Sequence, residues 1–350
     1  MAEGAGREPA TQATAAHAPN IERMADFDHS HITPDGYLKS WAVGKHLAMR
    51  LVEDPGRALE VAPKDAGVRR GFTRERQADG SYVNRLDPAF GQLESIALPL
   101  LSTLDERWPV DGIERGRISE LIAIQVLRSP AWRSFHAQAV PNARENVRPN
   151  HPRAEARHFE AAEALLLTDR ERHGRLLWQS PILTTIIANM HWTLLRTGRP
   201  RLVTSDHPVV PIGLEEAATS KTQPITAGGL MNTLEFRFAA RPDLLLVMSW
   251  HDAGEDELPR RLAPHHIRNH NSLVIAQAER QWFHHPDVAP AYSGGAWHPI
   301  STDLHRGYGA ATARGSQRRA EVERQIAGSL GSGTLAEKVP VMRWPVRRAA

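Results

Sequence analysis

Apolar residues that recur every three or four positions predict helices in the middle of the chain. The clearest run covers residues 88–107, an amphipathic pattern that Pro99 is expected to kink. A second helix is predicted at 114–127, and Pro130 ends or kinks it. Two further helices are predicted at 159–172 and 176–197. We therefore expect a largely helical middle region.

Short apolar runs between polar loops predict strands in the second half. The runs at 201–204, 209–212, 233–238 and 244–250 have the length of strands, and the last is almost continuously apolar, which is typical of a buried strand. A helix is predicted at 264–282, with Pro264 in its first turn. Because helices and strands do not alternate regularly, the pattern favours an α+β fold, with the helical middle region packed on a mixed or antiparallel β-sheet.

Composition divides the chain into three parts. Residues 1–25 are mostly Ala, Gly, Thr, Glu and Pro and lack the pattern of a signal peptide, so we expect a disordered N-terminal tail. Residues 26–285 are expected to form a single α+β domain. Residues 286–350 are expected to form a C-terminal extension with one polar helix at 317–329 and a basic tail from Lys338. The longest apolar segment, 181–195, is too short and too polar to span a bilayer, so no membrane contact is expected.

Composition also limits the chemistry. The 350 residues include no cysteine, which excludes disulfides, thiolate nucleophiles and iron–sulfur clusters and leaves any metal site to His, Asp, Glu or Asn. Basic residues number 43 and acidic residues 40, so the net charge of +3 permits a nucleic-acid partner without indicating one. The phosphate-loop, dinucleotide-binding and nucleophile-elbow motifs are absent. The absence of cysteine and of a signal-peptide pattern favours a cytoplasmic protein.

Two pairs of polar residues are candidates for ligand binding. His29 and His31 would face the same way on a strand, where they could bind a metal or flank a phosphate, or could simply be a turn histidine and a packed histidine. Gln125 and Arg128 stand one helical turn apart, so they could together hold a carboxylate or a phosphate. The alternative is that Arg128 only caps or salt-bridges the end of its helix.

Asp206 is a third candidate, because it ends a short strand and precedes His207 and Pro208. Polar residues at the point where a strand opens into a loop frequently carry function. The alternative is an Asx turn, in which the carboxylate accepts backbone N–H groups and sets up the proline turn.

The predicted helix at 264–282 carries several polar residues. His266 and His270 stand four apart without the glutamate of the zinc-protease motif, and we expect them to be solvent-facing or hydrogen-bonded. Asn269 and Asn271 are poor helix formers, so we expect their side chains to form hydrogen bonds or to hold a neighbouring loop.

Five short motifs occur in the same order as in a known protein family. They are His31-Ile-Thr-Pro34-Asp-Gly-Tyr37-Leu38-Lys-Ser-Trp41, Phe72-Thr73 with Leu93-Glu94, Gln125-Val-Leu-Arg128-Ser-Pro130, Leu202-Val-Thr-Ser205-Asp206-His-Pro208, and Ile267-Arg-Asn269-His-Asn271. The chain thus resembles the Domain of Unknown Function 4238 family over residues 28–283, approximately. The resemblance implies a bacterial, cytoplasmic protein and supplies no activity. Asp35, Gly36 and Ser30 depart from the family's glutamine, aromatic residue and second histidine.

The leading hypothesis joins these motifs in one pocket. Asp206 would act as acid–base or metal ligand, Arg128 would bind an anion, and His31 would shuttle a proton or ligate a metal. The substrate-binding residues would be Gln125, Ser205 and Asn271. This hypothesis predicts a hydrolase of a phosphate-containing or nucleic-acid substrate, with Mg²⁺ or Mn²⁺ as the candidate cofactor.

The alternative hypothesis is a non-catalytic binding or regulatory module. In that case the same polar residues form a buried network that fixes the helical half against the sheet, because buried polar groups must be paired. Exposure separates the two hypotheses, since catalytic residues need a path for the substrate, whereas a structural network would be closed to solvent and would have no pocket.

Overall fold

The computed structural model describes residues 29–77, 79–129, 169–213, 233–251, 255–256, 258–292, 299–304, 315–326 and 346–347. The predicted tail at 1–25, most of the predicted helix at 159–172 and nearly all of the basic tail from Lys338 lie outside these ranges. In the described part of the chain, no helix is both long enough and apolar enough to cross a membrane.

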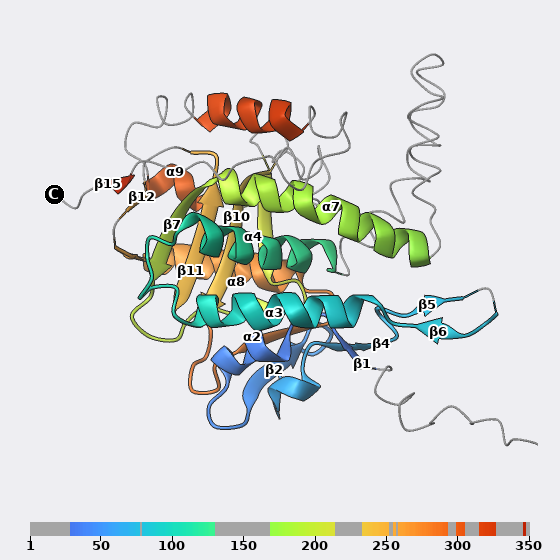
Figure 1. The fold of residues 1–350 in the computed structure, drawn as a ribbon. Helices are drawn as coiled ribbons and strands as arrows, with labels where there is room; N and C mark the ends of the chain where they lie inside the picture. Colours follow the sequence, from blue (N-terminus) through green and yellow to red (C-terminus); the bar gives the residue numbers. More distant parts are fainter. Residues whose placement is uncertain are drawn as a thin grey trace, which may run out of the picture.

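A five-stranded sheet forms the centre of the fold (Figure 1). Its order is β13-β7-β11-β10-β9, in which only β13 runs parallel to its neighbour. The strands are β7 (His191–Arg196), β9 (Val209–Gly213), β10 (Thr233–Arg241), β11 (Leu244–Ser249) and β13 (Arg260–Arg261). The sheet is thus mixed and mainly antiparallel, which confirms the predicted α+β fold.

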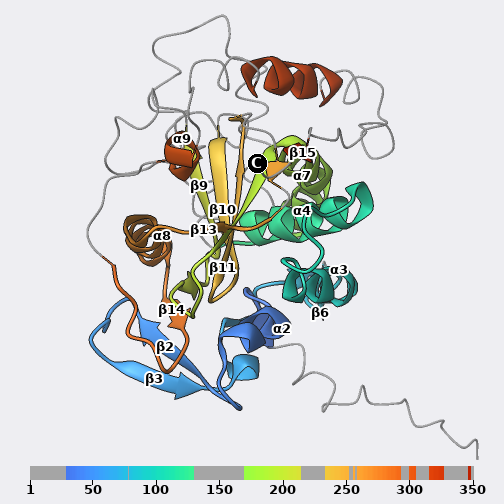
Figure 2. The ribbon, with the colours of Figure 1, turned by 90° about the vertical axis from the view of Figure 1, so that its left-hand side faces the viewer.

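Helices cover both faces of this sheet (Figure 2). One face carries α3 (Leu86–Ser102), α4 (Gly112–Leu127) and α7 (Asp169–Asn189). The other carries α8 (Pro264–Gln277) and the short α9 (Ile300–Leu304). Asp111 caps α4, because its carboxylate accepts the backbone N–H groups of Ile113 and Glu114, each at 2.8 Å.

The long inner strand β10 explains this two-sided arrangement. Its side chains alternate, so Phe236 and Phe238 belong to the main apolar core that includes α3, α4 and α7. Glu235 and Arg237 point to the opposite face, where Arg237 donates from Nη1 to Asn269 of α8 at 2.7 Å. Two buried phenylalanines on one face therefore pack against apolar helices. The ion pair on the other face requires polar groups from α8.

A second sheet of four strands packs beside the first. Its order is β3-β2-β14-β8, and its strands are β2 (Leu47–Leu51), β3 (Ala58–Val61), β8 (Thr204–Ser205) and β14 (Gln281–His284). Three two-stranded ladders complete the described strands: β1 (His29–His31) with β4 (Val68–Arg70), β5 (Glu75–Arg76) with β6 (Tyr82–Val83), and β12 (Glu255–Asp256) with β15 (Val346–Arg347).

Two predicted helices were too long, and both errors have the same cause. The helix predicted at 176–197 ends at Asn189, and the next residues form β7, which pairs with β11 over its whole length. The helix predicted at 264–282 ends at Gln277, and the following residues form β14 between β2 and β8. Pairing in a buried sheet outweighs the local apolar pattern, which does not distinguish a buried strand from a helix.

The segment predicted as a C-terminal extension contributes to the main core. Residues 315–326 are helical, close to the polar helix predicted at 317–329. Val322 and Ile326 of this helix, together with Ile300 of α9, are buried in the same apolar cluster as Phe236. These contacts argue for one folded unit that continues beyond residue 285.

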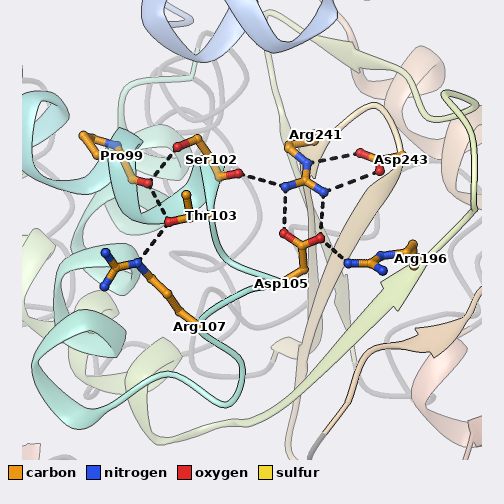
Figure 3. A network of polar contacts seen from close by, with 8 residues as sticks. All are labelled: Pro99, Ser102, Thr103, Asp105, Arg107, Arg196, Arg241 and Asp243. Carbon is orange, nitrogen blue, oxygen red and sulfur yellow. Dashed lines mark hydrogen bonds and ion pairs between the residues drawn. The ribbon is translucent and has the colours of Figure 1, made fainter.

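A polar network fastens the end of α3 to the edge of the central sheet (Figure 3). Arg241 of β10 donates to both carboxylate oxygens of Asp105, at 2.7 and 3.0 Å, and to the carbonyl of Ser102 at 2.8 Å. Asp243 and Arg196 join from the neighbouring turn and from β7. The hydrogen bond from Arg241 is the main reason that the pKa of Asp105 lies below its ordinary value of 3.8.

We expect Asp105→Asn to lower the free energy of unfolding by about 1–3 kcal/mol, because the amide cannot accept both N–H groups of Arg241. The contribution of Asp105 is complete above its unfolded pKa near 3.8 and is lost as the pH falls through the lower folded value. Urea unfolding at pH 7 and pH 3 measures this, and the difference between wild type and Asp105→Asn should shrink at pH 3. An equal difference at both pH values would contradict the assignment.

Candidate functional site

Arg128 is the centre of the candidate site. It lies at the C-terminal end of α4, and only 2% of it is exposed. Its Nη1 donates to Oε1 of Glu94 on α3 at 2.9 Å, and its guanidinium carbon lies 5.2 Å from the ring centre of Phe90. Burial lowers the pKa of Arg128, and the negative charge of Glu94 opposes this effect. Arginine nevertheless stays charged at neutral pH.

One edge of the Arg128 guanidinium has no hydrogen-bond partner among the described residues. Both Nε and Nη2 on this edge are buried. These two groups point in parallel, which is the geometry that binds a carboxylate or a phosphate through two oxygens. The amide of Gln125, one turn earlier, is also buried, and neither its nitrogen nor its oxygen is hydrogen-bonded in the described chain. Because buried polar groups nearly always have partners, this edge is the candidate position for a ligand.

A second group of polar side chains lies around Asp87. Ser30 Oγ and Thr73 Oγ1 share a hydrogen bond of 2.5 Å, and Ser30 also donates to Asp87 Oδ2 at 3.2 Å. Asn84 donates to the same oxygen at 2.5 Å. The charge of Asp87 also raises the pKa of Arg128. The contacts of this cluster therefore join β1, the turn before β5 and the start of α3, and its charge reaches Arg128.

His31 takes no part in this cluster. Because adjacent residues of a strand point to opposite sides, Ser30 faces the cluster and His31 faces away. The His31 ring bonds through Nε2 to the carbonyl of Lys64 at 3.0 Å. His31 is therefore explained by its contact with Lys64. The adjacent residue, Ser30, is the one that contacts Asp87.

Asp206 lies in a second set of contacts, at the junction of α8 and β14. Its Oδ1 accepts the backbone N–H of Glu279 at 3.0 Å, and its Oδ2 accepts those of Arg280 and Gln281 at 2.8 and 3.2 Å. Burial raises the pKa of Asp206, and the three N–H groups oppose this effect. The carboxylate holds the connection between a helix and a strand, which favours the architectural alternative for this residue.

Ser205 and Asn271 belong to the same junction. Ser205 Oγ donates to the carbonyl of His207 at 2.9 Å and accepts the N–H of that residue at 3.0 Å. The Asn271 amide oxygen accepts the N–H of Val203 at 3.1 Å, while its nitrogen donates to the carbonyls of Arg201 and Ala291 at 2.9 and 3.0 Å. All these polar atoms are paired with backbone, so they fix β8 against α8.

The first motif of the chain docks on this junction. Thr33 donates to the carbonyl of Ser205 at 3.1 Å, and Tyr37, on the short helix α2 (Asp35–Leu38), donates to the carbonyl of Ala239 at 2.6 Å. Trp41, on the 3₁₀ turn η1 (Lys39–Trp41), reaches the carbonyl of Leu202 at 3.4 Å. The motif at 31–41 and the motif at 202–208 therefore form a structural interface.

The six predicted site residues fall into three sets of contacts. Gln125 and Arg128 lie together at the end of α4, whereas Ser205, Asp206 and Asn271 lie at the α8–β14 junction. His31 lies apart from both sets, against the turn η2 (Pro63–Asp65). Among the described residues, no hydrogen bond or ion pair joins Arg128 to Asp206.

The sequence reasoning did not select four residues of these contacts, namely Ser30, Thr73, Asp87 and Glu94. Thr73 and Glu94 belong to the family motifs Phe72-Thr73 and Leu93-Glu94. Their place in the same set of motifs as Gln125 and Arg128 was the signal that could have identified them. Asp87 lies outside those motifs, and only the fold brings it to Ser30.

The solvent-facing alternative for His266 and His270 was wrong, because both side chains are buried. Burial lowers the pKa of His270 to about 3. Arg237, beneath α8, lowers it further. An uncharged imidazole avoids placing a second cation beside that arginine.

The fold and contacts define an α+β protein with a buried arginine cluster on one face of its central sheet. The model of the family described as "Protein of unknown function (DUF4238)" matches residues 30–288, and the chain belongs to this family. No curated protein and no solved structure matches the chain.

We expect Asp206→Ala to destabilise the protein by about 3 kcal/mol, because it leaves buried N–H groups of the α8–β14 connection without an acceptor. Asp206→Asn keeps one acceptor oxygen and should cost less than the alanine variant. Urea unfolding followed by circular dichroism measures both. Wild-type stability in Asp206→Ala would contradict the architectural role.

Acid should destabilise the fold through His207, which is buried with a pKa lowered to about 4 by desolvation. The unfolded chain binds this proton near pH 6.5 and the folded chain only near pH 4, so stability falls as the pH falls through this interval. His207→Gln should flatten the dependence by up to about 1.4 kcal/mol per pH unit. The test is the urea midpoint measured from pH 7 to pH 4.5, and an unchanged slope in His207→Gln would refute it.

Proposed function

We propose that this protein binds a phosphate-containing ligand at the free edge of Arg128. The observation that carries the proposal is the buried pair of Nε and Nη2 groups, which have no partner among the described residues, one helical turn from the equally unpartnered amide of Gln125. Two parallel N–H donors match two oxygens of one phosphate group. The Gln125 amide offers one further donor and one acceptor for the rest of the ligand.

The local charge selects the kind of phosphate. Glu94 lies 2.9 Å from Arg128, and Asp87 is close enough to affect its pKa. Two carboxylates therefore more than offset the single positive charge of Arg128, so a doubly charged phosphomonoester would be repelled more strongly than a singly charged group. A phosphodiester carries one negative charge, so we propose a small phosphodiester as the preferred ligand.

Hydrolysis of that phosphodiester is the reaction that we propose to test. An arginine whose Nε and Nη2 groups are both free to donate can stabilise the charge that develops on phosphate oxygens in the transition state. Asp206 contributes to this proposal only through the fold, because its oxygens hold three backbone N–H groups. Carboxylates nearer to the arginine, Glu94 and Asp87, are the groups available to act on a water molecule.

The direct experiment is a calorimetric titration with a dinucleoside monophosphate, with 5′-AMP and inorganic phosphate as comparisons. Arg128→Lys keeps the positive charge but loses the two parallel N–H donors. The affinity of this variant for the dinucleotide should therefore fall by about 10–100-fold. Arg117→Lys, on the exposed part of the same helix, is the matched control and should bind like wild type. Product analysis by chromatography then separates an enzyme from a binding module.

Gln125→Met distinguishes a ligand role from a structural one. Replacing an unpaired buried amide by an apolar side chain of similar shape should leave stability unchanged or raise it. The same change should weaken dinucleotide binding, because a ligand contact is lost. Wild-type affinity in both Arg128→Lys and Gln125→Met would overturn the proposal.

A further inference from the structure

A separate group of potential metal ligands lies on the opposite face of the central sheet. His265 and His266 begin α8, and Asp303 lies on α9. Their ligand atoms all lie within 4.8 Å of one another, and His266 Nε2 is 3.7 Å from Asp303 Oδ2. In a tetrahedral site with bonds of about 2.1 Å, ligand atoms are about 3.4 Å apart. Small rotations of the two exposed side chains, His265 and Asp303, would close the remaining distance.

We propose that His265, His266 and Asp303 bind a divalent transition metal ion of the zinc class. Two imidazoles and one carboxylate suit zinc and its neighbours, whereas magnesium and calcium prefer oxygen ligands alone. Three protein ligands leave a fourth position for water or for a bound group, which is the arrangement of catalytic zinc sites. The proposal does not depend on the phosphodiester proposal, because α4, which ends at Arg128, covers the other face of the sheet (Figure 2).

The chemistry of His266 supports metal binding over a simple ion pair. Its side chain is buried beside Asp303. An imidazole nitrogen that carries no proton offers the lone pair that a metal ion requires. The pair at 3.7 Å is also longer than a hydrogen bond.

The buried pair of Glu235 and Arg237 holds the two ligand-bearing helices in place. Glu235 accepts the backbone N–H groups of Ile300 and Ser301 at the start of α9, at 3.1 and 2.7 Å. Arg237 donates to Asn269 of α8 at 2.7 Å. One ion pair on β10 therefore fixes both elements of the proposed site. Such support from the residues behind the ligands is typical of metal centres.

The test uses the full chain, stripped of metal with a chelator and dialysed before titration with Zn²⁺. We expect one tight zinc site per chain in wild type, with affinity reduced by on the order of 100-fold in His265→Ala and in Asp303→Asn. Both changed side chains are exposed, so the variants should stay folded, which circular dichroism checks. His46→Ala, an exposed histidine on another part of the surface, is the control and should bind zinc like wild type.

Co²⁺ gives a second readout of the same site. Binding with two imidazoles, one carboxylate and water should produce the intense visible absorption of four- or five-coordinate cobalt, and excess Zn²⁺ should remove it. Weak binding of several zinc ions that is the same in wild type, His265→Ala and Asp303→Asn would overturn the proposal. So would a wild-type chain that gives only the faint spectrum of hydrated cobalt.

Discussion

The buried ion pair between Glu235 and Arg237 is the constraint on which the arrangement of both sheet faces depends. Neither side chain is exposed, and an isolated charge at such a position would cost several kcal/mol. Although burial alone would raise it, the pKa of Glu235 is lowered, because Arg237 and Ser301 stabilise the carboxylate. Satisfying this pair requires α8 and α9 on one face. Phe236 and Phe238, which alternate with it along β10, require apolar helices on the other face.

The polar motifs of the chain serve two different purposes. In the motifs at 31–41 and 202–208, the main polar contacts end on backbone groups, as Tyr37 shows on Ala239 and Asp206 on the turn at 279–281. These contacts join the N-terminal segment, the second sheet and α8. The motif at 125–130 is different, because Arg128 and Gln125 keep buried polar atoms that no described residue satisfies. This difference is the reason that the proposed ligand is placed at Arg128 rather than at Asp206.

The sequence predicted most helices and strands of the fold, but it did not predict which residues lie near Arg128. Regular apolar spacing located α3 and α4, and short apolar runs located β9, β10 and β11. The same signal failed at Trp192 and Trp282, where pairing with distant strands decides the conformation. Arg128 and Gln125 were found because they share a helical turn. Ser30 and Asp87 were not, because 57 residues separate them and only the fold brings them together. The adjacent His265 and His266 gave no metal signal without Asp303.

We propose that Arg128 presents its Nε and Nη2 groups to a phosphate group, whereas Asp206 supports the fold. The most direct measurement is the NMR signal of the Arg128 side-chain Nε–H, assigned by its loss in Arg128→Lys, during titration with a dinucleoside monophosphate. A new hydrogen bond at Nε should shift this signal downfield in a saturable manner, with the same dissociation constant as calorimetry. A signal that stays unchanged while the dinucleotide binds elsewhere, or a protein that binds no phosphodiester, would contradict the account.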